Sequence, residues 1–130
     1  MVAEPSDWVD QLARAVIGAA IEVHKVLGAG FLESVYEEAL CIELALRGVA
    51  FERQKPIALT YKGQPVGEAR LDLLVGGELI LELKAVERIH PIHKAQVINY
   101  LRATGCQLGL LLNFNVEQMR EGIDRIILTQ

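Results

Sequence analysis

Residues 70–84 read Arg-Leu-Asp-Leu-Leu-Val-Gly-Gly-Glu-Leu-Ile-Leu-Glu-Leu-Lys, two short apolar runs on either side of a pair of glycines. Runs of this length around a Gly-Gly step predict a β-hairpin with half-buried strands. Because side chains at i and i+2 share one face of a sheet, Glu82 and Lys84 are expected to point the same way. Leu81 and Leu83 then point into the opposite layer.

The register of this hairpin decides whether the carboxylate of Asp72 joins that of Glu82. A two-residue turn would pair Asp72 with Leu81 and put the two carboxylates on opposite faces. A three-residue loop, 76–78, with a glycine at the left-handed position of a bulge, places Asp72 opposite Glu82. We predict the three-residue loop, which brings the two Cβ atoms to about 4.5–5.5 Å.

Two carboxylates so close in a partly buried site repel each other, and a divalent cation neutralises them. Asp72 and Glu82 are therefore candidate ligands of Mg²⁺ or Mn²⁺, hard cations that prefer oxygen ligands and keep several waters. Lys84 can orient an attacking water and stabilise the charge of a phosphorane-like transition state. The hairpin also fits an exposed strand face with a cross-strand ion pair, so both interpretations stay open.

A second motif lies at residues 28–38, Gly-Ala-Gly-Phe-Leu-Glu-Ser-Val-Tyr-Glu-Glu. Its Gly30, Glu33 and Tyr36 resemble the signature of the GxxExxY family, a compact branch of the PD-(D/E)xK nuclease superfamily. The resemblance covers most of the chain, about 17–128, through the segments 70–74, 82–87, 95–101 and 109–114. It implies an α/β fold with a restriction-endonuclease-like core, a mixed β-sheet flanked by helices, in a single domain over residues 1–130.

The resemblance also implies roles for four side chains in one metal site. Asp72 and Glu82 correspond to the metal-binding carboxylates, and Lys84 corresponds to the catalytic lysine. Glu33 corresponds to a helix-borne acid that supplements the metal site. The alternative for Glu33 is a first-turn acid that the helix N-terminus stabilises.

Gln96 and Tyr100 resemble a Gln-x-x-x-Tyr element that follows the lysine strand in related nucleases, which adds them to the candidate catalytic residues. Beside a metal ion they can hydrogen-bond phosphate or water, or they can form a polar edge that bonds the sheet. The proline often found before the metal-binding Asp is absent here, because Arg70 and Leu71 precede it.

Periodicity and turn residues predict the remaining elements in the order ααββββαβ, with a short helix and a strand at the end. On the second helix, we expect Glu33, Tyr36 and Glu37 to share one side. The apolar side of that helix is expected to be Leu32, Val35, Ala39, Ile42 and Ala45. The expected helices are 7–27, 31–46 and 91–104, the strands 50–53, 57–61, 66–75, 79–85 and 107–114, and the final pieces 116–121 and 123–128.

A histidine metal site is a weaker alternative. His90 and His93 could bind zinc with a nearby carboxylate, but a structural zinc site needs four nitrogen or sulfur ligands. Cys41 and Cys106 do not belong to a Cys-x-x-Cys unit. The isolated cysteines, the lack of a signal-like N-terminus and the lack of a membrane-length apolar run predict a cytoplasmic protein.

The charge balance speaks against a strong general attraction to polyanions. Seventeen acids outnumber thirteen bases, and the net charge is −4. Basic residues nevertheless gather on the middle strands, at Arg53, Lys55, Lys62 and Arg70, and after the candidate site, at Lys84, Arg88, Lys94 and Arg102. They predict a basic rim around an acidic metal centre, or they are ordinary solvated surface. So small a chain leaves little surface for substrate recognition, so we also expect a homodimer or a protein partner.

These features favour a Mg²⁺-dependent or Mn²⁺-dependent nuclease that hydrolyses phosphodiester bonds of DNA or RNA. Two alternatives remain open at this point. The chain could be a non-enzymatic binding or regulatory module on a nuclease fold, or a metal-dependent hydrolase of a small phosphate ester.

Overall fold

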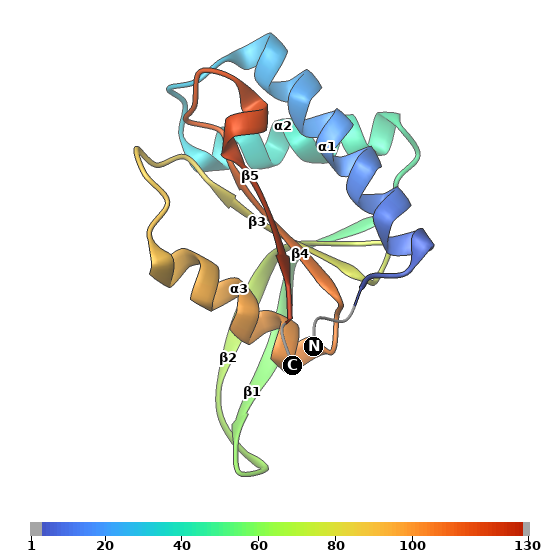
Figure 1. Cartoon of the computed structure of the whole chain (residues 1–130), viewed down its shortest axis with the longest axis vertical. Coiled ribbons are helices and arrows are strands. Elements are labelled where there is room, and N and C mark those ends of the chain that lie inside the picture. The colour runs from blue at the N-terminus through green and yellow to red at the C-terminus, as the bar shows by residue number, and fades with distance from the viewer. Residues whose placement is uncertain (1–3, 129–130) are drawn as a thin grey trace.

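The structure, a computed structural model, describes residues 4–128. Two helices come first, then a three-stranded antiparallel segment, a crossover helix and two further strands (Figure 1). In chain order the elements are α1 (Asp7–Leu27), α2 (Glu33–Leu46), β1 (Phe51–Tyr61), β2 (Gln64–Val75), β3 (Leu79–Lys84), α3 (Pro91–Thr104), β4 (Leu108–Asn113), the 3₁₀ helix η1 (Met119–Gly122) and β5 (Ile123–Ile127).

A five-stranded mixed sheet with the spatial order β1-β2-β3-β4-β5 forms the centre of the molecule. β3 and β4 are parallel, and every other neighbouring pair is antiparallel. The parallel pair requires a crossover connection, which α3 provides. The observed fold is a mixed α/β architecture consistent with a restriction-endonuclease-like core, as predicted.

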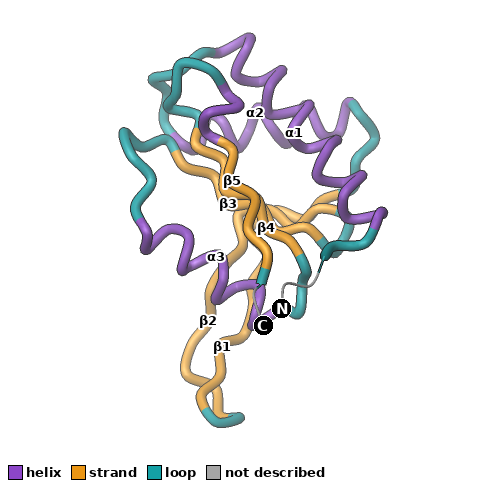
Figure 2. Tube along the Cα trace, viewed as in Figure 1, coloured by secondary structure: helices purple, strands orange, loops and turns teal. Residues whose placement is uncertain are grey.

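The sheet is covered on both faces, and this divides the core into two layers. Figure 2 shows α1 and α2 together on one side of the sheet and α3 on the other. The larger layer joins α1 and α2 to alternate leucines of the strands, including Leu81 and Leu83. The smaller layer joins Val97 and Leu101 of α3 to the opposite sheet face. Alternation along the strands therefore places Glu82 away from the larger layer.

Helix ends follow the expected local chemistry. Ser6 caps α1 by accepting a hydrogen bond from the backbone N–H of Val9. Pro91 begins α3, and Gly105, with a φ of 77°, ends it in the left-handed conformation. No helix within residues 4–128 is long and apolar enough to cross a membrane.

The two strands expected at 50–53 and 57–61 are one continuous strand, β1. Its pairing with β2 is interrupted at Gln54, whose φ is 49°, and shifts register between Leu59 and Thr60. Pro56 does not end the strand because β1 lies at the edge of the sheet, where a residue without an N–H is tolerated. Three strands, rather than the expected four, therefore precede α3.

The predicted apolar side of α2 was wrong. Leu32, Val35 and Ile42 are 75%, 37% and 60% exposed, and the buried side of α2 carries Tyr36 and Leu40 instead. The ring of Tyr36 stacks on that of Phe114, with centroids 4.7 Å apart, which turns this side toward the sheet.

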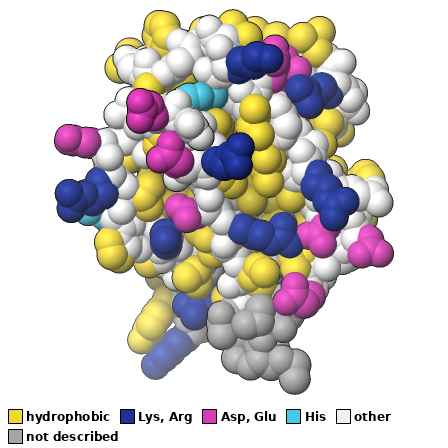
Figure 3. Space-filling model, turned by 45° about the horizontal axis from the view of Figure 1, so that its top comes forward, with side chains coloured by type: hydrophobic (Ala, Val, Ile, Leu, Met, Phe, Trp, Pro, Cys, Tyr) yellow, Lys and Arg dark blue, Asp and Glu magenta, His cyan; other side chains and the backbone are white. Residues whose placement is uncertain are grey.

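Figure 3 shows hydrophobic side chains gathered at the upper margin of the surface, with basic and acidic side chains interspersed below.

Candidate active site

The hairpin between β2 and β3 has the predicted register. Val75 pairs with Leu79 and Leu73 pairs with Leu81, so the loop contains the three residues 76–78. Both loop glycines have positive φ angles, 58° at Gly76 and 72° at Gly77, which a side chain would disfavour. Continuing this register places Asp72 opposite Glu82, as expected.

Beyond the pair Leu73–Leu81, β2 and β3 separate. Hydrogen bonds between backbone N–H groups and carboxylates there replace the backbone-to-backbone bonds of the ladder. The ladder between β2 and β3 ends at Leu73 and Leu81. The Asp72 carboxylate accepts a hydrogen bond of 2.8 Å from the backbone N–H of Leu83, and the backbone N–H of Asp72 donates one of 3.3 Å to Glu82. Each carboxylate is thus held by the opposing strand, so both lie at the opening of the sheet.

Burial makes this pair of acids costly to ionise. Glu82 is 5% exposed, and burial, followed by the negative charge of Asp72, raises its pKa to about 8. Burial also raises the pKa of Asp72, although the Leu83 N–H and the charge of Lys84 act in the opposite direction. A nearby cation would relieve this cost, and neither acid forms an ion pair with any residue between 4 and 128.

Lys84 and Glu33 approach this pair from two elements. Lys84 is half-buried at the end of β3, and its positive charge lowers the pKa values of the carboxyls around it. Glu33 lies in the first turn of α2 at the surface, where partial burial and then the charge of Asp72 raise its pKa. The structure therefore brings Glu33, Asp72, Glu82 and Lys84 within electrostatic range of one another.

The two predicted residues of α3 lie on the other side of the opening. Tyr100 is half-buried, and burial, followed by the charges of Glu82 and Asp72, raises the pKa of its hydroxyl. Gln96 is exposed and lines a pocket together with Lys84. Tyr100 is thus close to the carboxylates, and Gln96 lies at the rim.

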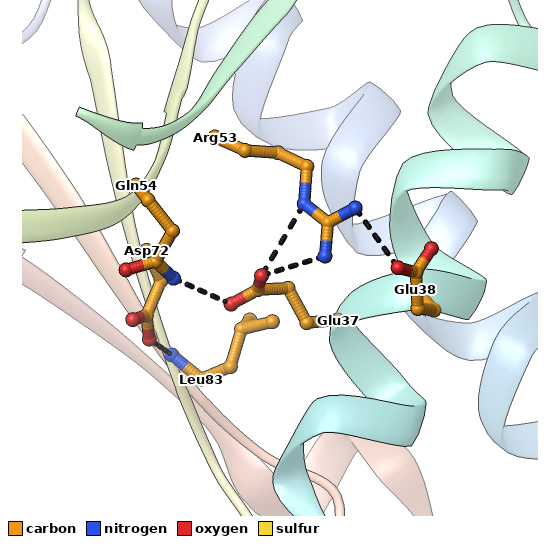
Figure 4. Close-up of polar contacts among 6 residues, drawn as sticks. All are labelled: Glu37, Glu38, Arg53, Gln54, Asp72 and Leu83. Carbon is orange, nitrogen blue, oxygen red and sulfur yellow. Dashed lines mark hydrogen bonds and ion pairs between the residues drawn. The ribbon is translucent and has the colours of Figure 1, made fainter.

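Sequence reasoning missed Gln54. In the register of β1 and β2, Gln54 is opposite Asp72, and the Gln54 side chain acts to lower the pKa of that carboxyl. The same amide donates a 3.0 Å hydrogen bond to Glu37 (Figure 4). Its φ of 49° is rare for a residue with a side chain and is typical of strained positions near functional sites. A single polar residue in an edge strand carries no signal that would have predicted this.

Glu37 is the second residue of this network. It is buried, and it accepts hydrogen bonds of 2.8 Å and 3.3 Å from the guanidinium of Arg53, which also bonds Glu38 (Figure 4). Its spacing from Glu33 had placed both acids on one side of α2. Because Arg53 neutralises Glu37 and Glu37 accepts from the Gln54 amide, this acid fixes the side chain that lies opposite Asp72.

The Gly30-to-Tyr36 motif has a structural explanation. The buried hydroxyl of Tyr36 donates a 2.6 Å hydrogen bond to the carbonyl of Gly28 and accepts one of 3.2 Å from the N–H of Phe31. Gly30 has a φ of 104°, which only glycine adopts without strain. The motif therefore closes the turn between α1 and α2 and sets the position of the helix turn that carries Glu33.

Among residues 4–128, the histidines belong to no group of three or more side chains that could hold a metal ion. His93 accepts a hydrogen bond from the backbone N–H of His90 and caps the start of α3. The Nε2–H of His24 donates a 2.8 Å hydrogen bond to the carbonyl of Val116, which joins α1 to the segment before η1.

No group of three or more His, Cys, Asp or Glu side chains in the described chain, 4–128, is arranged to hold a metal ion. The donor chemistry of Asp72 and Glu82 nevertheless fits a magnesium-type ion. Such an ion is commonly held by one or two carboxylates and keeps several of its waters. Asp72 and Glu82, two desolvated acids without an ion-pair partner among residues 4–128, supply these two carboxylates.

Comparison with protein families agrees with this geometry. Residues 10–126 match the family model described as the PD-(D/E)XK nuclease superfamily. That span includes every candidate residue described above. Members of this superfamily generally use divalent metal ions. The comparison with curated proteins found no match. The chain belongs to the PD-(D/E)XK nuclease superfamily.

Proposed function

We propose that this chain is a metal-dependent nuclease of the GxxExxY branch, which hydrolyses phosphodiester bonds of DNA or RNA with Mg²⁺ or Mn²⁺. The observation that carries this proposal is the pair of buried acids at the opening between β2 and β3, with Lys84 beside them. A structural ion pair does not explain the arrangement, since neither acid has a cationic partner among residues 4–128.

Asp72 and Glu82 would hold the cation, which supplies Lewis acidity and lowers the pKa of a bound water. The backbone N–H groups of Leu83 and Asp72 fix the two carboxylates, so little reorganisation is needed on binding. Glu33 supplements the site from the first turn of α2. Lys84 orients the attacking water and stabilises negative charge that develops on the phosphate oxygens.

Gln96 and Tyr100 are proposed to act on the substrate side of the site. The amide of Gln96, exposed beside Lys84, can hydrogen-bond a phosphate oxygen or a water. Burial, followed by the charges of Glu82 and Asp72, raises the pKa of the Tyr100 hydroxyl, a group that can donate a hydrogen bond. Both residues thus contribute neutral donors next to an anionic substrate.

The test is cleavage of single-stranded and double-stranded DNA and RNA with Mg²⁺ or Mn²⁺. Asp72→Asn and Lys84→Met should each lower the rate by at least about 100-fold, because removal of one electrostatic stabiliser costs that much. Glu78→Gln and Lys25→Met, exposed residues away from the site, are the matched controls and should cleave at the wild-type rate. Equal cleavage by all five proteins would reject the assignment.

A non-enzymatic binding module on the nuclease fold is the second candidate. The observation in its favour is the lack, within residues 4–128, of a three-ligand group that could hold a metal ion. Calorimetric titration with Mg²⁺ and Mn²⁺, with and without a non-cleavable oligonucleotide, separates the two candidates. Binding abolished by Asp72→Asn supports the nuclease, and no heat of binding under either condition supports the module.

Two further parts of the proposal concern the setting of the protein. We propose a homodimer or a complex with a protein partner in the cytoplasm, because the small domain offers little surface for substrate recognition. Size-exclusion chromatography with light scattering at micromolar concentration should give twice the chain mass, and a monomer would reject the dimer.

A further inference from the structure

A groove follows α3 from the β1–β2 hairpin to the segment before the helix. Three adjoining pockets form it: Thr60 and Arg102 line the first, Lys84 and Gln96 the second, and Arg88 and His90 the third. Asn99 lines both the first and the second pocket, and His93 lines both the second and the third. We call this continuous surface the α3 groove.

The helical spacing supports one groove rather than three separate hollows. His93, Gln96, Asn99 and Arg102 are each three residues apart, so successive members are neighbours on a row that winds obliquely around α3. Figure 1 shows α3 running beside the β1–β2 hairpin, which supplies the second wall near Thr60. Lys84 of the candidate site lies in the middle pocket, so the groove passes the opening between β2 and β3.

The charge of the α3 groove is opposite to that of the whole chain. Its lining contains Lys84, Arg88 and Arg102 and one acid, Glu87. None of these three cations forms an ion pair with another residue in the described part of the chain. On the opposite side of the sheet, by contrast, the guanidiniums of Arg47, Arg53 and Arg125 are each paired with acids.

We propose that the α3 groove is the path of a nucleic-acid strand through the site, with Arg88 and Arg102 binding its phosphates on either side of Lys84. This inference rests on the proposed nuclease function and names the surface that brings the substrate to it. The polar lining between the arginines, Gln96 and Asn99, suits phosphate and sugar contacts, which position a strand without selecting its sequence.

The length of the groove matches this occupant. Residues 92–102 of α3 extend over about 15 Å at the usual helical rise. This length equals about four nucleotide steps at the stacked spacing of ~3.4 Å. A strand of at least that length presents phosphates along the groove from Ile92 to Arg102 and can place one phosphodiester at Lys84.

The test is binding of a fluorescent 20-nucleotide strand, single or in duplex, measured by anisotropy in EDTA at several salt concentrations. Arg88→Ala/Arg102→Ala should weaken binding at least tenfold. The slope of log affinity against log salt should fall by about 1.4 on single strands, which corresponds to two lost phosphate contacts. The matched control, Arg14→Ala/Lys25→Ala, removes two exposed cations that are also unpaired within residues 4–128, but from α1 on the other face.

The proposal is supported if the control variant keeps the wild-type affinity and salt slope while the groove variant loses both. This holds for single strands or duplexes, whichever form binds. Equal losses in both variants would show a general charge effect and overturn it. Wild-type affinity in the groove variant would also overturn it, as would binding of poly-glutamate peptide in place of the oligonucleotide. Cleavage by Lys84→Met at the wild-type rate would instead reject the nuclease function, so the two failures are distinguishable.

Discussion

Glu82 should make the metal-free protein less stable as the pH rises, and Glu82→Gln should remove this effect. The folded state raises the pKa of Glu82 from its usual 4.5 to about 8. Between these values the folded chain keeps a proton that the unfolded chain releases, so the free energy of unfolding falls with increasing pH. From pH 5 to pH 8 the fall is about 3 kcal/mol, since one pKa unit corresponds to ~1.4 kcal/mol.

Glutamine has nearly the shape of protonated glutamate and keeps an oxygen that can accept from the Asp72 N–H. The variant should therefore match the wild type near pH 5 and exceed its stability by about 3 kcal/mol near pH 8. The assay is urea unfolding in EDTA, followed by circular dichroism between pH 5 and pH 8. Glu78→Gln, in the exposed loop of the same hairpin, is the control and should follow the wild-type curve.

Parallel stability curves for wild type and Glu82→Gln across this range would refute the reasoning, because they would mean that Glu82 is not desolvated in the folded protein. Adding Mn²⁺ near pH 8 should stabilise the wild type and not Glu82→Gln. Metal binding favours the folded state and requires the deprotonated carboxylate.

Three other substitutions test the surrounding structure. Gln54→Leu removes the amide that bonds Glu37 opposite Asp72, so calorimetry should show Mn²⁺ affinity lowered about tenfold, and unchanged affinity would contradict the positioning role. Tyr36→Phe removes the buried hydroxyl that bonds the turn between α1 and α2, and should cost about 1–3 kcal/mol in urea unfolding; a neutral result would argue against that role. Gly122→Ala would place a Cβ 1.9 Å from the carbonyl oxygen of Asn113, so it should cost about 3 kcal/mol of stability and lower the thermal midpoint. Gly67→Ala, whose Cβ meets nothing within 4 Å, is the control and should change the midpoint little. Equal midpoints for the two variants would contradict this packing.

The second helix shows where sequence patterns fail. Apolar residues occur almost all around α2, so periodicity alone does not choose its buried side. Stacking of Tyr36 on Phe114, a residue 78 positions later in the chain, makes that choice. The continuity of β1 was missed for a similar reason, because Pro56 ends a central strand but is tolerated at a sheet edge.

Local rules did determine the hairpin that carries the candidate site. The two-residue period of a strand put Glu82 and Lys84 on one side, and two adjacent glycines allowed the loop that sets Asp72 opposite Glu82. These relations span a few residues, so backbone geometry alone decides them.

Tertiary structure decided how the acids are held and which residues support them. The contacts of Asp72 with Gln54, of Gln54 with Glu37, and of Glu37 with Arg53 join two strands and a helix that no short-range pattern connects. The α3 groove likewise exists only because α3 packs beside the hairpin. Sequence alone therefore predicted the register that sets the two carboxylates opposite each other, and packing set their surroundings, because burial and charge depend on residues brought together from distant parts of the chain.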